Sequence, residues 1–173
     1  MTIRKYRIDI FLVDDHAMFN EGLSQAINQS DCMHISRTFT SLAACRQTME
    51  ERSPDVLLLD ISMPDGDSLD FCRWVVSERP KVHIVAVTVH DEYSVIQRML
   101  DCGVHGYVLK SAPIEQLKQA ITVVWQGRRY ISPDVETIIS QGQAKAVILS
   151  SVELGILRLV CDCLLYTSPS PRD

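Results

Sequence analysis

Acidic side chains follow two of the most apolar runs in the sequence, at the point where each run ends. Asp14 and Asp15 come directly after the run that ends at Val13, and Asp60 comes directly after the run that ends at Leu59. Carboxylates that share one site repel one another, and a hard divalent cation that takes oxygen ligands relieves that repulsion. Mg²⁺ fits this set of donors best. The residues therefore predict a magnesium site where the ends of the two runs meet.

Polar residues also stand at the ends of two later apolar runs. Thr88, which carries a hydroxyl group, follows Val87, and Lys110, which carries an amine, follows Leu109. A metal held by some carboxylates can orient a phosphoryl group onto another, which then acts as the nucleophile and becomes an aspartyl phosphate. Lys110 would supply positive charge to the phosphoryl oxygens, and Thr88 would supply a hydrogen bond. A single Asp at a strand end is usually a loop or cap residue, so the prediction rests on suitable residues at successive strand ends.

The elements that position these residues follow from an alternation of short apolar runs with longer amphipathic stretches. The predicted strands are Ile8–Val13, Met33–Thr38, Asp55–Leu59, Val82–Thr88 and Val104–Leu109. The predicted helices are Ala17–Gln29, Ser41–Arg52, Ser68–Arg79, Asp91–Cys102 and Pro113–Gln126. This order predicts an α/β fold with a doubly wound, five-stranded parallel sheet, of either common strand order. In such sheets ligands bind beyond the carboxyl ends of the strands, where the site residues fall, and in the flavodoxin-like order the first and third strands are neighbours.

Capping residues agree with these boundaries. Ser41 and Asp91 stand where N-caps belong, and Gly103 and Gly127 stand where glycines end helices. We therefore expect the last helix of the domain to end before Gly127.

Composition limits the class of protein. The chain has 173 residues, a net charge of −5 and six cysteines without a C-x-x-C pair. The length excludes a large multidomain enzyme, and the charge excludes a strong overall field for nucleic acid. Without a secretory segment or an apolar run long enough for a membrane span, the sequence predicts a cytoplasmic protein with free thiols and no membrane contact.

The motifs together resemble the receiver domain of two-component response regulators. They are D-D-H after the first strand, L-L-L-D-I-S-M-P-D-G-D after the third, V-T after the fourth and G-Y-V-L-K-S-A-P after the fifth. The resemblance covers roughly residues 8–126 and implies a flavodoxin/CheY-like (βα)5 fold. Pro64 and Gly66 in the loop after Asp60 also match the family pattern.

The resemblance implies a role for each residue of the motifs. Asp60 matches the phosphoacceptor, and Mg²⁺ is held by Asp14, Asp15, Asp60 and the backbone carbonyl of Ser62. Thr88 matches the switch hydroxyl, Lys110 the phosphate-binding lysine and Tyr107 the aromatic rotamer switch. His16 is interpreted only as the loop residue that enters the first helix.

A second resemblance begins at Leu149. The segment L-S-S-V-E-L-G-I-L-R-L-V resembles the opening of the LuxR/NarL (FixJ) type helix-turn-helix domain. Ser151, Val152 and Gly155 differ from the usual residues of that family. The expected organisation is a receiver at 1–127, a helical linker at 128–148, the start of a truncated LuxR-type helix-turn-helix domain at 149–162, and a non-native, adapter-derived tail at 163–173.

These resemblances predict a response regulator, not an enzyme. It would accept a phosphoryl group from a sensor histidine kinase, form a homodimer on phosphorylation and, in an intact parent, regulate transcription. DNA is expected as a partner of that parent but not of this chain, because the recognition helix is missing from this sequence.

Two other classes of protein use related sheets. A haloacid-dehalogenase-like (HAD-like), Mg²⁺-dependent phosphatase also has an Asp nucleophile, but it needs a D-x-D pair after the first strand, where this sequence has D-D-H. A flavodoxin-like FMN module needs a Ser/Thr/Gly-rich phosphate loop there, and Asp14 and Asp15 would repel the phosphate.

Overall fold

Every strand of the sheet runs parallel to its neighbours, in the order β2-β1-β3-β4-β5-β6. The computed structural model describes residues 6–144 and residue 156. The strands are β1 Ile8–Val13, β2 Met33–Phe39, β3 Val56–Leu59, β4 His83–Thr88, β5 Gly106–Leu109 and β6 Tyr130–Ile131. The α/β fold and the flavodoxin-like order are confirmed. The prediction of five strands is wrong, because the two-residue β6 adds a sixth strand beside β5.

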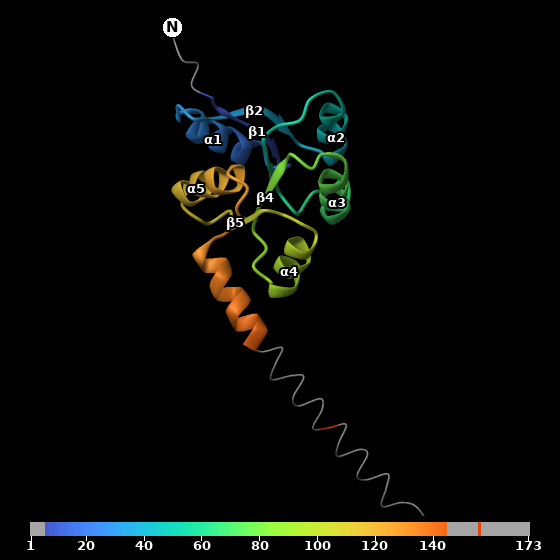
Figure 1. Cartoon of the computed structure of the whole chain (residues 1–173), viewed down its shortest axis with the longest axis vertical. Helices are drawn as coiled ribbons and strands as arrows, with labels where there is room; N and C mark the ends of the chain where they lie inside the picture. Colours follow the sequence, from blue (N-terminus) through green and yellow to red (C-terminus); the bar gives the residue numbers. More distant parts are fainter. Residues whose placement is uncertain (1–5, 145–155, 157–173) are drawn as a thin grey trace, which may run out of the picture.

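Helices cover both faces of the sheet (Figure 1). They are α1 Ala17–Asn28, α2 Leu42–Glu51, α3 Ser68–Glu78, α4 Tyr93–Asp101 and α5 Ile114–Trp125. Ser41 caps α2 as predicted, because its side chain accepts a hydrogen bond from the Ala44 amide. The prediction for α4 is wrong: Glu92, not Asp91, is the N-cap residue, and no side chain completes that cap.

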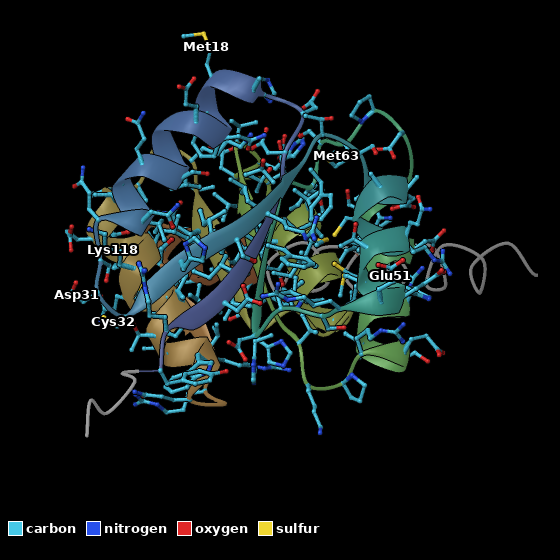
Figure 2. The ribbon with its side chains drawn as sticks, turned by 90° about the horizontal axis from the view of Figure 1, so that it is seen from above. Met18, Asp31, Cys32, Glu51, Met63 and Lys118 are labelled. Atoms are coloured by element: carbon cyan, nitrogen blue, oxygen red, sulfur yellow. The ribbon has the colours of Figure 1, made fainter. Side chains whose placement is uncertain are left out.

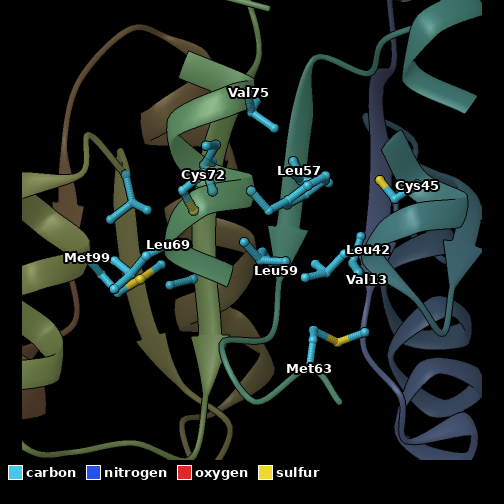
Figure 3. Close-up of a cluster of buried hydrophobic side chains, with 14 of the residues drawn as sticks. Val13, Leu42, Cys45, Leu57, Leu59, Met63, Leu69, Cys72, Val75 and Met99 are labelled. Carbon is cyan, nitrogen blue, oxygen red and sulfur yellow. The ribbon is translucent and has the colours of Figure 1, made fainter. Parts of the chain in front are cut away.

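Two hydrophobic clusters lie on opposite faces of the sheet. The first joins β-strand residues such as Phe11 and Leu57 to the inner sides of α2, α3 and α4 (Figure 3). The second joins Ile10 and Leu58 to α1 and α5. Successive residues along β1, and likewise along β3, therefore belong to different clusters, because side chains alternate between the two faces of a strand that is buried on both sides.

The chain after α5 returns to the sheet. The amide of Tyr130 donates to the carbonyl of His105 at 2.9 Å, and the amide of Ser132 donates to the carbonyl of Tyr107 at 3.1 Å. A further helix then covers residues 133–144, and its Val135 is completely buried in the first cluster. This part of the predicted linker therefore packs on the same face as α4.

The predicted start of the helix-turn-helix domain at 149–162 lies outside the described residues, apart from residue 156, and so does the predicted tail at 163–173. Within the described part of the chain, no helix is long and apolar enough to cross a membrane.

Candidate functional site

The acidic residues meet at the carboxyl ends of β1 and β3. These strands pair with Val13 opposite Leu59, so the residues that follow them leave the sheet side by side. The amide of Asp60 donates to the carbonyl of Val13 at 2.9 Å, which holds the two strand ends together. Asp14 and Asp60 are each only 1% exposed. The predicted meeting of the two acidic strand ends is confirmed.

Three carboxylates and one imidazole form a cluster that could hold a metal ion. One ligand atom from each of Asp14, Asp15, His16 and Asp60 lies within 4.8 Å of the others. The Nδ1 atom of His16 lies 3.0 Å from Asp14 Oδ1 and 2.9 Å from Asp15 Oδ1. The carboxylate oxygens suit a hard cation such as Mg²⁺, because several charged oxygens from different elements converge on one place. The residues present therefore fit the predicted metal.

Lys110 provides the positive charge inside the cluster. Its Nζ lies 2.5 Å from Asp14 Oδ2 and 2.7 Å from Asp60 Oδ2, and it stands 4.8 Å from the centre of the Phe19 ring. Partial burial lowers the pKa of Lys110, but the hydrogen bonds to Asp14 and Asp60 outweigh it, so the pKa lies above its ordinary value. Lys110 is therefore protonated at neutral pH and offsets part of the carboxylate repulsion.

Thr88 and Tyr107 are joined through His90. The amide of His90 donates to Thr88 Oγ1 at 3.3 Å, and the Tyr107 hydroxyl donates to the carbonyl of His90 at 3.0 Å. Thr88 and Tyr107 are both completely buried. Burial, followed by the charges of Glu92, Asp91 and Asp60, raises the pKa of Tyr107, so its hydroxyl remains a donor.

The loop after β3 is held in place from both ends. The Ser62 amide donates to Asp60 Oδ1 at 3.1 Å, and the Ser68 hydroxyl donates to the carbonyl of Ile61 at 2.8 Å. The carboxylate of Asp65 accepts hydrogen bonds from the amides of Leu42 and Ala43, both at 3.1 Å, at the start of α2. This charge on a helix N-terminus anchors the loop beside Asp60.

Sequence reasoning missed two residues of the site, His16 and His90. His16 touches both carboxylates of the first strand end, although the sequence indicates only a loop residue. His90 also contacts Ser62, with its Nε2 2.9 Å from the Ser62 hydroxyl. The motif D-D-H carries a weak signal for His16, whereas nothing in the sequence distinguishes His90 from an ordinary loop residue.

Comparisons with known proteins show the family of this chain. Residues 10–122 match the model of the response regulator receiver domain family. Oxygen regulatory protein NreC of Staphylococcus epidermidis is 34% identical over 87% of this chain and 76% of its own length. The crystal structure of a LuxR-family two-component response regulator from Aurantimonas sp. SI85-9A1 is 25% identical, covers 80% of this chain and 99% of that one, and has a TM-score of 0.75.

A third comparison shows the fold alone. RcsB from Salmonella enterica serovar Typhimurium, solved bound to a promoter in the presence of the phosphomimetic BeF3⁻, is 20% identical. It covers 80% of this chain and 69% of that one, with a TM-score of 0.74. The comparisons give no support to the phosphatase alternative. Because the family match covers most of the chain and the acidic cluster lies at the carboxyl ends of its strands, this chain belongs to the two-component response regulators and contains their receiver domain.

Proposed function

We propose that this receiver accepts a phosphoryl group from a sensor histidine kinase on Asp60, in a reaction that requires Mg²⁺. The ligands in this proposal are the carboxylates of Asp14, Asp15 and Asp60 and the backbone carbonyl of Ser62. The observation that carries the proposal is the setting of Asp60. Its buried carboxylate accepts a hydrogen bond from Lys110 on one oxygen and from the Ser62 amide on the other, beside two further carboxylates.

The arrangement separates the roles of the carboxylates. Asp14 and Asp15 share the contact with His16, and both come from the end of β1. Asp60 faces them from the end of β3. This placement supports Asp14 and Asp15 as a metal-binding pair and leaves Asp60 as the nucleophile, in agreement with its position in the receiver motif.

The chemical step needs little from the protein beyond position and charge. A carboxylate oxygen of Asp60 attacks phosphorus, the P–N bond to the kinase histidine breaks, and the imidazole leaves with the electron pair and takes up a proton from water. When bound, Mg²⁺ offsets the negative charge of the phosphoryl oxygens. Lys110 already lies at Asp60 and supplies a second positive charge, and Thr88 supplies a hydroxyl donor at the end of the next strand.

A hollow beside the site supports contact with a kinase. It has a volume of about 380 Å³, lies between α1 and α5, and is lined by apolar side chains and by Lys110. Met18 borders it and is 90% exposed; Figure 2 shows its side chain standing away from the start of α1. Met18→Asp is expected to slow phosphoryl transfer from a kinase that phosphorylates the wild type, without changing phosphorylation by acetyl phosphate. Equal slowing with both donors would contradict this location.

The biological role in this proposal is regulation of transcription in the cytoplasm, with no enzymatic turnover of a metabolite. Solved structures of RcsB bound to a promoter and of RcsB dimers bound to DNA support a DNA-binding domain and a homodimer in an intact parent. We expect that homodimer to form on phosphorylation. This chain by itself is not expected to bind a specific DNA sequence. A gel shift with genomic fragments and competitor DNA tests this expectation, and selective retention of one sequence would contradict it.

Intact-mass measurement tests the phosphoacceptor. With acetyl phosphate and Mg²⁺, the wild type should gain one phosphoryl group and Asp60→Asn none. Asp70→Asn, which changes an exposed carboxylate on α3, is the matched control and should behave like the wild type. Phosphorylation of Asp60→Asn at the wild-type rate would refute the assignment of Asp60. Phosphorylation of the wild type at an unchanged rate in excess chelator would refute the requirement for Mg²⁺.

A further inference from the structure

Two cysteines from different helices lie together on the face of the sheet that carries α3 and α4, away from the acidic site. Cys72 is on α3 and completely buried, and Cys102 is the partly exposed C-cap residue of α4. Neither residue contributes to the chemistry proposed for Asp60. Both thiols are free.

The packing of the two helices brings these cysteines into register. Leu69 and Cys72 are one turn apart on α3, and Met99 and Cys102 are one turn apart on α4 and its cap. Figure 3 shows the side chains of Leu69 and Met99 side by side. Residues three positions apart occupy the same face of a helix, so the next facing pair along the two helices is Cys72 and Cys102.

Two contacts fix Cys102 against α3 on either side of Cys72. The Cys102 thiol donates to the backbone carbonyl of Leu69 at 3.3 Å. A Cβ atom at the next residue, Gly103, would lie 3.3 Å from a methyl group of Val76, so the backbone there runs close to the following turn of α3. Leu69 and Val76 stand one turn before and one turn after Cys72, which places Cys102 opposite it.

The surroundings make the two thiols chemically different. A hydrogen bond from Cys72 lowers the pKa of Cys102 to about 7, against partial burial and with help from Arg73 on α3, although Asp67 and Asp70 oppose the shift. The same bond and burial raise the pKa of Cys72. At neutral pH Cys102 therefore has a large thiolate fraction, and the thiolate is the form that reacts with oxidants. By contrast, burial raises the pKa of Cys45 to about 12.

We propose that Cys72 and Cys102 form an oxidisable dithiol, in which a hydroperoxide oxidises Cys102 and Cys72 then closes a disulfide between α3 and the end of α4. In the first step the Cys102 thiolate attacks one peroxide oxygen, the O–O bond breaks, and the departing oxygen takes a proton to become an alcohol or water. In the second step the Cys72 sulfur displaces the hydroxyl group from the resulting sulfenic acid. That hydroxyl leaves as water with the Cys72 proton, so two thiols and one hydroperoxide give a disulfide, an alcohol and water.

Peptide mapping of the full chain tests the pairing directly. Cleavage after Lys and Arg releases Cys72 in peptide 53–73 and Cys102 in peptide 99–110, and each peptide contains no other cysteine. Reduced protein is treated with hydrogen peroxide at neutral pH, the free thiols are blocked with iodoacetamide, and the protein is cleaved without reductant. We expect the two peptides joined, with a mass lower by two hydrogen atoms than their sum.

Three variants distinguish this dithiol from general oxidation. Cys102→Ser should abolish the linked peptide, and Cys45→Ser, the matched control at another buried cysteine, should retain it. Cys72→Ser should stop at the Cys102 sulfenic acid, which dimedone captures. The proposal is overturned if wild-type peptides 53–73 and 99–110 remain separately alkylated while other cysteines are oxidised, or if Cys102 links instead to Cys32.

A second measurement does not depend on oxidation. The rate of Cys102 alkylation by iodoacetamide should rise to half its maximum near pH 7 in the wild type, because the pKa of Cys102 is lowered to about 7. In Cys72→Ala the half-point should move upward, because alanine has no group that can donate a hydrogen bond to the Cys102 thiolate. A wild-type half-point near 9, the ordinary pKa of a thiol, would overturn the role given to Cys72.

Discussion

The hydroxyl of Tyr107 donates a hydrogen bond to the backbone carbonyl of His90 at 3.0 Å, and the Tyr107 ring is completely buried. The amide of the same residue, His90, donates to the Thr88 hydroxyl. A hydroxyl that accepts a hydrogen bond still has its own hydrogen. Thr88 can therefore keep the hydrogen bond from the His90 amide and also donate one to a phosphoryl oxygen. The peptide segment at His90 therefore connects Thr88, the proposed hydroxyl donor to the phosphoryl group, with Tyr107, the proposed aromatic switch.

This connection predicts that Thr88 transmits the signal without performing the phosphoryl transfer. Thr88→Ala should still be phosphorylated on Asp60, but the phosphorylation-dependent NMR changes around Tyr107 should diminish. Tyr107 is buried in this structure, and the family resemblance implies that this inward position belongs to the phosphorylated protein. Phosphorylation is expected to increase the population of this position, and a coupling of about 1–3 kcal/mol suffices to shift it. Thr122→Ala, on α5, is the control. Undiminished changes in Thr88→Ala would show that the signal takes another route.

Asp15→Asn should change stability in opposite ways with and without metal. Lys110 pairs with Asp14 and Asp60, whereas the only ion pair of Asp15 among the described residues is with His16. Removing the Asp15 charge therefore reduces repulsion in the metal-free protein but should abolish the rise in melting temperature that Mg²⁺ causes by binding the folded state. Thermal melts with and without millimolar Mg²⁺ measure both effects, with the exposed Asp31→Asn as control. A wild-type Mg²⁺ response in Asp15→Asn would place the metal elsewhere.

His105 should make the fold sensitive to mild acid. Burial, followed by the charges of His83 and Arg129, lowers the pKa of His105 below its ordinary 6.5, and its Nδ1 accepts a hydrogen bond from the Ile84 amide at 3.2 Å. His105 therefore binds a proton more readily in the unfolded chain than in the folded one. Its contribution to the free energy of unfolding is complete above pH 6.5 and decreases as the pH falls below that value.

Denaturant unfolding between pH 7.5 and 5.5 measures this effect. The free energy of unfolding should fall less with acid in His105→Asn than in the wild type. His34→Asn, at an exposed histidine, should keep the wild-type slope. Equal slopes in all three proteins would show that His105 is not the acid-sensitive group.

Gly142 should be required for the helix at 133–144 to pack against α4. A Cβ atom at Gly142 would lie 2.3 Å from the Cγ atom of Tyr93, so even alanine requires the helix or the ring to move. Gly142→Ala should therefore increase amide exchange around Val135. Gly22→Ala is the matched control on α1, because nothing lies within 4 Å of its Cβ position, and it should stabilise the fold by roughly 0.5–1 kcal/mol. Wild-type exchange in Gly142→Ala would contradict this packing.

The sequence alone determined the fold class and the main site, because both depend on patterns along the chain. Continuous apolar runs ending at Val13 and Leu59 indicate strands buried on both faces, and parallel strands bring their carboxyl ends to one edge. Asp14 and Asp60 meet because β1 and β3 are neighbours in the flavodoxin-like order. The apolar runs left either common strand order open, and the resemblance of the motifs to receiver domains implied this one. Ser41 could likewise be predicted as a cap, because its hydrogen bond is local in sequence.

Only the tertiary structure decided the features that depend on approach between distant segments. Tyr130–Ile131 is too short to show a strand pattern and is ordered by pairing with β5. His90 gains its role because β4 ends beside the loop that holds Ser62, and Cys102 gains Cys72 as a neighbour because α3 and α4 pack in register. Hydrophobic periodicity specifies which face of a helix or strand is buried. Which polar atoms meet depends on the exact register and rotation of each element against its neighbours, and register and rotation are fixed only when the elements pack.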